Sequence, residues 1–150
     1  MAKFIYKMEN ILGIKYKMED QAKVAYGVAK KKLSIEEEKL FSLKKKLTLY
    51  LEKTRIIMQT RLDLTELKSL GQAVEITKGH IKVQELAVKR AENHVEIMRT
   101  RLNGAMLERK THEKLKENAW NEFYLEVESE QRKEIDELVS FKYNNPADAI

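Results

Sequence analysis

The amino-acid sequence predicts an all-α fold: a long antiparallel two-helix coiled coil, with helices over about residues 3–58 and 64–141. The first observation is composition, since 35% of the 150 residues are charged where globular proteins average about a quarter. The second is that the single proline, Pro146, lies near the end of the chain. The third is an apolar repeat in alternating steps of four and three residues, which is typical of a coiled-coil seam.

The first helix is predicted from the repeat that begins at Phe4. A one-residue slip after Ala29 is interpreted as a stutter, which locally relaxes supercoiling. Gly13 and Gly27 each weaken a helix by about 1 kcal/mol relative to alanine, and we expect them to allow close approach of a partner backbone. The predicted seam is Phe4, Met8, Ile11, Lys15, Met18, Ala22, Ala25, Ala29, Leu33, Glu36, Leu40, Leu43, Leu47, Tyr50, Thr54 and Ile57.

The second helix has the most regular repeat in the chain. Asp63 and Glu66 precede it in the pattern of a capping box, which places the connection at about residues 59–63. The predicted seam is Leu67, Leu70, Val74, Thr77, Ile81, Gln84, Val88, Ala91, Val95, Met98, Leu102 and Ala105, followed by a looser series of Leu115, Ala119, Phe123, Val127, Ile135 and Leu138. Residues 1–142 are thus predicted to form one hairpin domain, and residues 143–150 a disordered tail.

Asn103-Gly104 offers an alternative, because this dipeptide often forms a turn. A break there would give a three-helix bundle. We favour a continuous helix, since Met98, Leu102 and Ala105 keep their spacing across the dipeptide and no proline follows.

Charge favours the antiparallel arrangement. Residues 1–55 carry 14 basic and 7 acidic side chains, whereas residues 111–150 carry 5 and 10. A chain that turns near residue 61 would bring these two segments together, with residue i opposite roughly residue 122 minus i. A parallel arrangement would lose this match.

The second helix is expected to outrun the first by about 20 residues, from about 121 to 141. This overhang carries Phe123, Tyr124, Val127, Ile135, Leu138 and Phe141. Apolar surface on an unpaired helix indicates a binding element. A fraying end and a homodimer seam are the alternatives.

The residue types argue against catalysis and against bound cofactors or metals. Cysteine is absent and the five glycines are dispersed, which excludes thiol chemistry and a glycine-rich phosphate loop. His80, His94 and His112 lie too far apart along a helix to share a metal. Lysine runs at 30–32 and 44–46 wind around a helix, so we interpret them as solvated faces and expect no nucleic-acid binding. No apolar run approaches the roughly 20 residues of a membrane span, and Lys3 and Lys7 argue against a signal peptide.

Several segments resemble the FliJ family of the bacterial flagellar type III export apparatus. They are residues 4–12 (FIYKMENIL), Glu108-Arg109-Lys110 with residues 113–117, and Glu130, Lys133 and Asp136-Glu137. The resemblance covers about residues 2–140. It implies an antiparallel hairpin similar to the central shaft subunit of rotary ATPases. It also implies a cytoplasmic, non-enzymatic stalk at the inner face of the cell membrane, with a role in flagellum assembly and thereby in chemotaxis.

The resemblance further implies three classes of partner: the export ATPase FliI, the export-gate protein FlhA and export chaperones. The expected ATPase-binding residues, taken from the paired termini and the overhang, are Phe4, Met8, Trp120, Phe123, Tyr124, Val127, Ile135, Leu138 and Phe141. The expected gate-binding residues are Leu40, Leu43, Tyr50 and Gln84. Leu43 and Tyr50 match the family pattern, whereas Lys39 and Lys46 on the same helix depart from it. A generic coiled-coil scaffold or a shaft subunit of another rotary ATPase is the alternative function.

Overall fold

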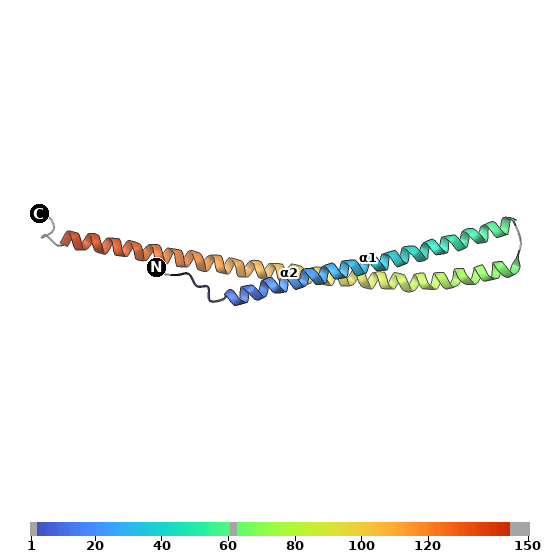
Figure 1. Cartoon of the computed structure of the whole chain (residues 1–150), viewed down its shortest axis with the longest axis horizontal. Helices are drawn as coiled ribbons and strands as arrows, with labels where there is room; N and C mark the ends of the chain where they lie inside the picture. The colour runs from blue at the N-terminus through green and yellow to red at the C-terminus, as the bar shows by residue number, and fades with distance from the viewer. Residues whose placement is uncertain (1–2, 61–62, 145–150) are drawn as a thin grey trace. The chain divides into compact units, whose positions relative to one another are not determined.

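A computed structural model describes residues 3–60 and 63–144 of the chain. Two helices account for nearly all of these residues, α1 over Glu9–Thr60 and α2 over Leu64–Asn144 (Figure 1). They run in opposite directions and contact each other over most of α1. The predicted all-α antiparallel hairpin is therefore confirmed.

The first helix begins six residues later than predicted. Phe4 and its neighbours precede α1, and the Glu9 amide donates to the Tyr6 carbonyl at 3.2 Å in the turn that opens the helix. The reason is tertiary, because the Phe4 ring packs against Trp120 and Phe123 of α2. Phe4 thus occupies a position of the apolar repeat although its backbone is not helical.

The second helix begins as predicted at its Asp63 cap. The Asp63 carboxylate accepts hydrogen bonds from the amides of Thr65 and Glu66, at 3.1 and 3.3 Å. These amides are among the donors that a helix start leaves without a helical partner. Residues 61–62 of the predicted connection lie outside the described residues.

The second helix ends later than predicted. Tyr143 and Asn144 belong to α2, so they are not part of a disordered tail, and residues 145–150 lie outside the described residues. The helix also continues through Asn103-Gly104, so the three-helix alternative is wrong. A Cβ built on Gly13 or Gly27 would meet nothing within 4 Å, so the close backbone approach expected there does not occur within the described chain.

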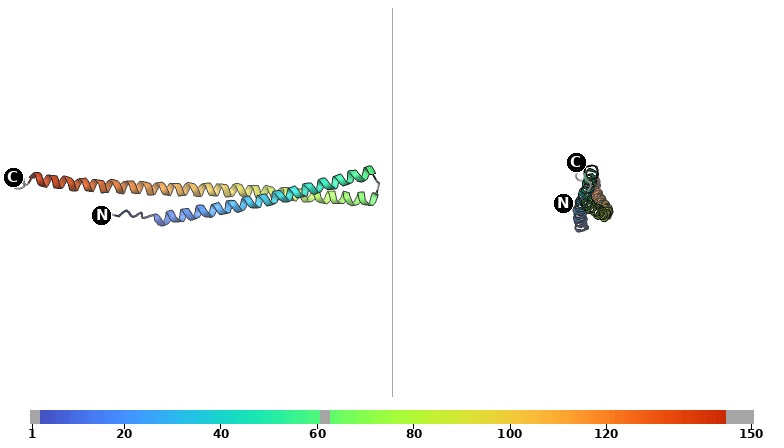
Figure 2. Two further views of the ribbon diagram at one scale, coloured as in Figure 1. Left: turned by 45° about the horizontal axis from the view of Figure 1, so that its top comes forward. Right: turned by 90° about the vertical axis from the view of Figure 1, so that its right-hand side faces the viewer.

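The chain divides into two compact units. The central unit consists of residues 20–104, and the terminal unit of residues 1–19 and 105–150. In the central unit α1 and α2 lie side by side and antiparallel (Figures 1 and 2). Its core is apolar: Ala29 of α1 packs with Val95 and Met98 of α2.

The predicted seams are confirmed in the central unit. All seam positions of α1 from Ala22 to Ile57 are buried or half-buried, and so are those of α2 from Leu67 to Leu102. Side chains exposed by less than 10% on α2 are Val74, Thr77, Ile81, Val88, Ala91, Val95 and Met98. Gln84 and Glu36 show the register, since the Gln84 side-chain amide donates to the Glu36 carbonyl at 2.9 Å. This pairing is two residues from the predicted one.

The predicted seam of α1 is only partly confirmed in the terminal unit, since Phe4 and Lys15 are half-buried as predicted but other seam positions are not. Leu12 and Glu19 are buried, at 3% and 5% exposure, whereas the predicted Ile11 and Met18 are 38% and 45% exposed. At Met18 the search for apolar residues selected the wrong position, because the residue that α1 buries there is the adjacent Glu19. Met8 and Leu115 are likewise exposed, at 41% and 46%.

The stutter predicted after Ala29 is also unnecessary. Buried and half-buried residues follow one heptad register in steps of three and four. The series is Leu12, Lys15, Glu19, Ala22, Tyr26, Ala29, Leu33 and Glu36. Polar residues at Lys15 and Glu19 concealed this register from an apolar count.

Candidate partner-binding surfaces

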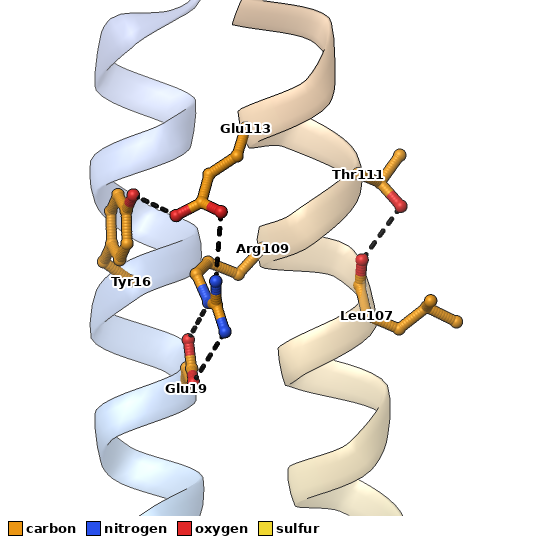
Figure 3. Close-up of polar contacts among 6 residues, drawn as sticks. All are labelled: Tyr16, Glu19, Leu107, Arg109, Thr111 and Glu113. Carbon is orange, nitrogen blue, oxygen red and sulfur yellow. Dashed lines mark hydrogen bonds and ion pairs between the residues drawn. The ribbon is translucent and has the colours of Figure 1, made fainter. Parts of the chain in front are cut away.

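The seam of the terminal unit is polar. In Figure 3, Tyr16 and Glu19 of α1 face Arg109 and Glu113 of α2. The Arg109 guanidinium donates to both oxygens of the Glu19 carboxylate, and through Nη1 to Glu113 at 3.0 Å. The Tyr16 hydroxyl donates to the other oxygen of Glu113. One guanidinium therefore connects two carboxylates from opposite helices.

Ionisation in this network follows from the hydrogen bonds. The bond from Tyr16 lowers the pKa of Glu113, as does the nearby charge of Arg109, and the same bond raises the pKa of Tyr16. The bond to Glu19 raises the pKa of Arg109, which stays protonated at any physiological pH. Glu113 is thus favoured in its ionised form and Tyr16 in its neutral form beside a protonated Arg109.

Two further ion pairs join the helices in the terminal unit. Lys15 lies 2.8 Å from Glu108, and this contact lowers the pKa of the Glu108 carboxyl. Lys116 lies 2.8 Å from Glu9, in the first turn of α1. Of these pairs only that of Lys15 with Glu108 has the base on α1 and the acid on α2, as the charge tally predicts. The pairs of Lys116 with Glu9 and of Arg109 with Glu19 have the opposite polarity.

An aromatic cluster closes the paired part of the terminal unit. The Phe4 ring meets Trp120 edge to face with centroids 5.1 Å apart, and it lies 5.4 Å from the Phe123 ring. Phe4, Leu12 and Trp120 also line a cavity of about 450 Å³ whose polar wall includes Lys116. Three of the residues expected to bind the ATPase are therefore brought together, whereas Met8 is exposed.

Beyond this cluster α2 continues without a described segment beside it (Figures 1 and 2). Every residue from 129 to 144 is exposed, so an overhang is present, although it begins later than the predicted residue 121 because Phe123 contacts Phe4. Large apolar side chains on it are Tyr124, Leu125, Ile135, Leu138, Val139, Phe141 and Tyr143, each more than half exposed. Val127 is half-buried. Leu125 and Val139 are exposed side chains that the apolar repeat did not select.

The expected gate-binding residues lie on the seam of the central unit. Leu40, Leu43, Tyr50 and Gln84 are half-buried, and Gln84 also bonds the Glu36 side chain. Lys46 stands over the Tyr50 ring, with its Nζ 5.8 Å from the centroid. A partner would meet the edges of these side chains, so the assignment of the four residues stays a prediction.

The described residues hold no group of three or more histidine, aspartate or glutamate side chains that could bind a metal. Within the same ranges no helix is long and apolar enough to cross a membrane. The candidate functional features of the described residues are surfaces: the polar paired end, the apolar extension of α2 and the flanks of the central unit.

These features define a class, the helical-hairpin coiled-coil proteins. The chain belongs to the FliJ family, because the family model described as Flagellar FliJ protein matches residues 4–148. No curated protein and no solved structure matches the chain. Proteins of this family are non-catalytic, cytoplasmic stalk components of flagellar protein export.

Proposed function

We propose that this chain is the stalk of the flagellar export ATPase complex, which binds the FliI ring through its terminal unit and the FlhA gate through its central unit. It works in the cytoplasm and associates with the inner face of the cell membrane through the export apparatus, where it also escorts export chaperones. Family membership supports the flagellar export role, and the surfaces of the hairpin support the division between partners.

The observation that carries the ring contact is the exposed end of α2. Ile135, Leu138 and Phe141 are 59%, 64% and 64% exposed, and they lie on a segment of α2 with no described neighbour. Burial of such a side chain contributes about 1.5–3 kcal/mol when it is complete. Residues 121–141 also carry seven acidic and two basic side chains, which would orient the helix against a basic ring lining.

The test removes this apolar surface without touching the paired region. The variant I135S/L138S/F141S should keep its helicity by circular dichroism, because all three side chains are exposed. It should lose most of its binding to FliI and its stimulation of FliI ATPase activity.

A matched control substitutes three equally exposed side chains of α1, V24S/F41S/M58S, at 67%, 69% and 63% exposure. This control should bind FliI as the unaltered chain does. Full binding by the α2 variant would show that the overhang is not the ring contact, and equal losses in both variants would indicate nonspecific hydrophobic association.

A further inference from the structure

A second apolar row follows α1 in the central unit, outside the seam. Val28, Ile35, Leu49 and Ile56 are 63%, 43%, 55% and 47% exposed, and they recur at multiples of seven residues with Ser42 completing the series. Each stands one residue before a seam position. A heptad period keeps such a row on one flank of a coiled coil along its whole length.

A row of lysines accompanies these apolar residues on the same flank. Lys32, Lys39, Lys46 and Lys53 are exposed and seven residues apart, each four residues after a member of the apolar series. Among the described residues only Lys39 of this row forms an ion pair, with Glu36 of its own helix at 3.8 Å. Since α2 supplies no carboxylate to this row in the described chain, its positive charge is available to another molecule.

The second helix contributes a matching flank. Ile76, Val83 and Ile97 are 59%, 68% and 52% exposed and keep the heptad spacing, with Arg90 at the remaining position. A cavity of about 230 Å³ is lined by Lys32 and Glu36 of α1 together with residues of α2 that include Arg90. The rows of the two helices therefore border one groove.

Ala87 and His94 also line this cavity, beside the seam of α2. The small side chain of Ala87 lets a further backbone approach closely. The opposite flank of α2 is different: Lys68, Lys82 and Lys89 alternate there with Glu75 and Glu96. Ion pairs occur on that side, with Glu75 3.7 Å from Lys78 and Glu96 3.0 Å from Arg99.

We infer that this groove binds an acidic amphipathic helix of a partner protein as the third strand of a coiled coil. Two apolar rows on either side of a groove fit the apolar stripe of one helix. The lysine row and Arg90 fit acidic residues that flank such a stripe. The identity of this partner as FlhA rests on the gate contact proposed above. The groove would supply the apolar and basic side chains for that contact.

The probe is a labelled helical peptide of about 28 residues, which at 1.5 Å per residue spans the distance from Val28 to Ile56. It has leucine at positions a and d of each heptad and glutamate at e and g. Its binding to the full chain is measured by fluorescence anisotropy, beside a peptide with lysine in place of glutamate. The acidic peptide should bind, more weakly as salt rises, and the basic one should not.

Two pairs of matched variants locate the binding. K39E/K46E/K53E should weaken the acidic peptide by about tenfold or more, whereas K68E/K82E/K89E on the other flank should not change its affinity. I76S/V83S should weaken it as well, and F41S/L86S, equally exposed but outside the groove, should not. Circular dichroism confirms that each variant keeps its helices.

Absence of acidic-peptide binding up to about 1 mM, a weak complex by any standard, would overturn the inference. Equal effects of the paired variants would also overturn it, and so would a chain that self-associates through this groove, since the occupant would then be a second copy. Peptide binding at the groove without any binding of the FlhA cytoplasmic region would refute the gate proposal alone.

Discussion

Replacement of Phe4 by alanine should release the segment that precedes α1 from α2. The Phe4 ring contacts Trp120 and Phe123 at centroid distances of 5.1 and 5.4 Å, and an aromatic pair contributes about 0.5–1.5 kcal/mol beyond its buried area. Loss of both pairs weakens docking by about 1–3 kcal/mol, which increases the opening equilibrium constant by roughly five- to 150-fold.

Trp120 is the single tryptophan of the chain, so its fluorescence reports this event directly. In Phe4→Ala its emission should shift to longer wavelength and acrylamide should quench it faster, while far-ultraviolet circular dichroism stays unchanged. Phe41→Ala is the matched control, because Phe41 is 69% exposed in the central unit. An unaltered Trp120 signal in Phe4→Ala would refute the argument that ring contacts hold this segment.

Three further perturbations test the two seams. Glu19→Leu and Arg109→Leu should each lower the melting temperature because each removes one side of the Glu19–Arg109 ion pair and leaves the other charge at a largely buried position, and the double variant should recover most of the loss; additive losses would contradict this. The pKa of Glu108 and of Glu113 is lowered in the folded chain, so the stability they contribute is complete above the ordinary value of 4.5 and is lost as pH falls through the lowered one. Acid titration should therefore expose Trp120, and no change down to pH 2 would argue against these pairs. Met98→Ala should cost about 2–3 kcal/mol in urea unfolding, since Met98 is 7% exposed at the apolar core; a loss below about 0.5 kcal/mol would show that this core is loosely packed.

Most of the fold could be predicted from the sequence, because coiled-coil periodicity and helix-start chemistry are local signals. The seam of α2 and its cap at Asp63 are examples. The full seam of α1 before Ala22 could not be predicted, since its register includes Glu19, a buried carboxylate that pairs with Arg109 of the other helix. No apolar count identifies a position whose occupant is charged.

The candidate surfaces were predictable to different degrees. The overhang followed from helix lengths, and its exposed apolar residues are largely those expected. The aromatic cluster required tertiary knowledge, because Phe4 reaches Trp120 from non-helical backbone. Of the four gate residues, Leu43 and Tyr50 were selected by family position and the others by seam spacing. All four are half-buried, so a seam position does not by itself establish that a partner can reach the side chain.

The contrast between an apolar seam in one unit and a polar seam in the other has a kinetic consequence. Pairing near the connection joins residues close in sequence, whereas the contact of Lys116 with Glu9 spans 107 residues. Because closing a longer loop costs more entropy, pairing of the two helices should begin next to the connection and reach Glu9 last. Amide hydrogens in the first turns of α1 should then exchange through local fraying, while those around Val88 and Val95 exchange only on global unfolding. The end assigned to the ring is consequently the end that can separate at the smallest energetic cost.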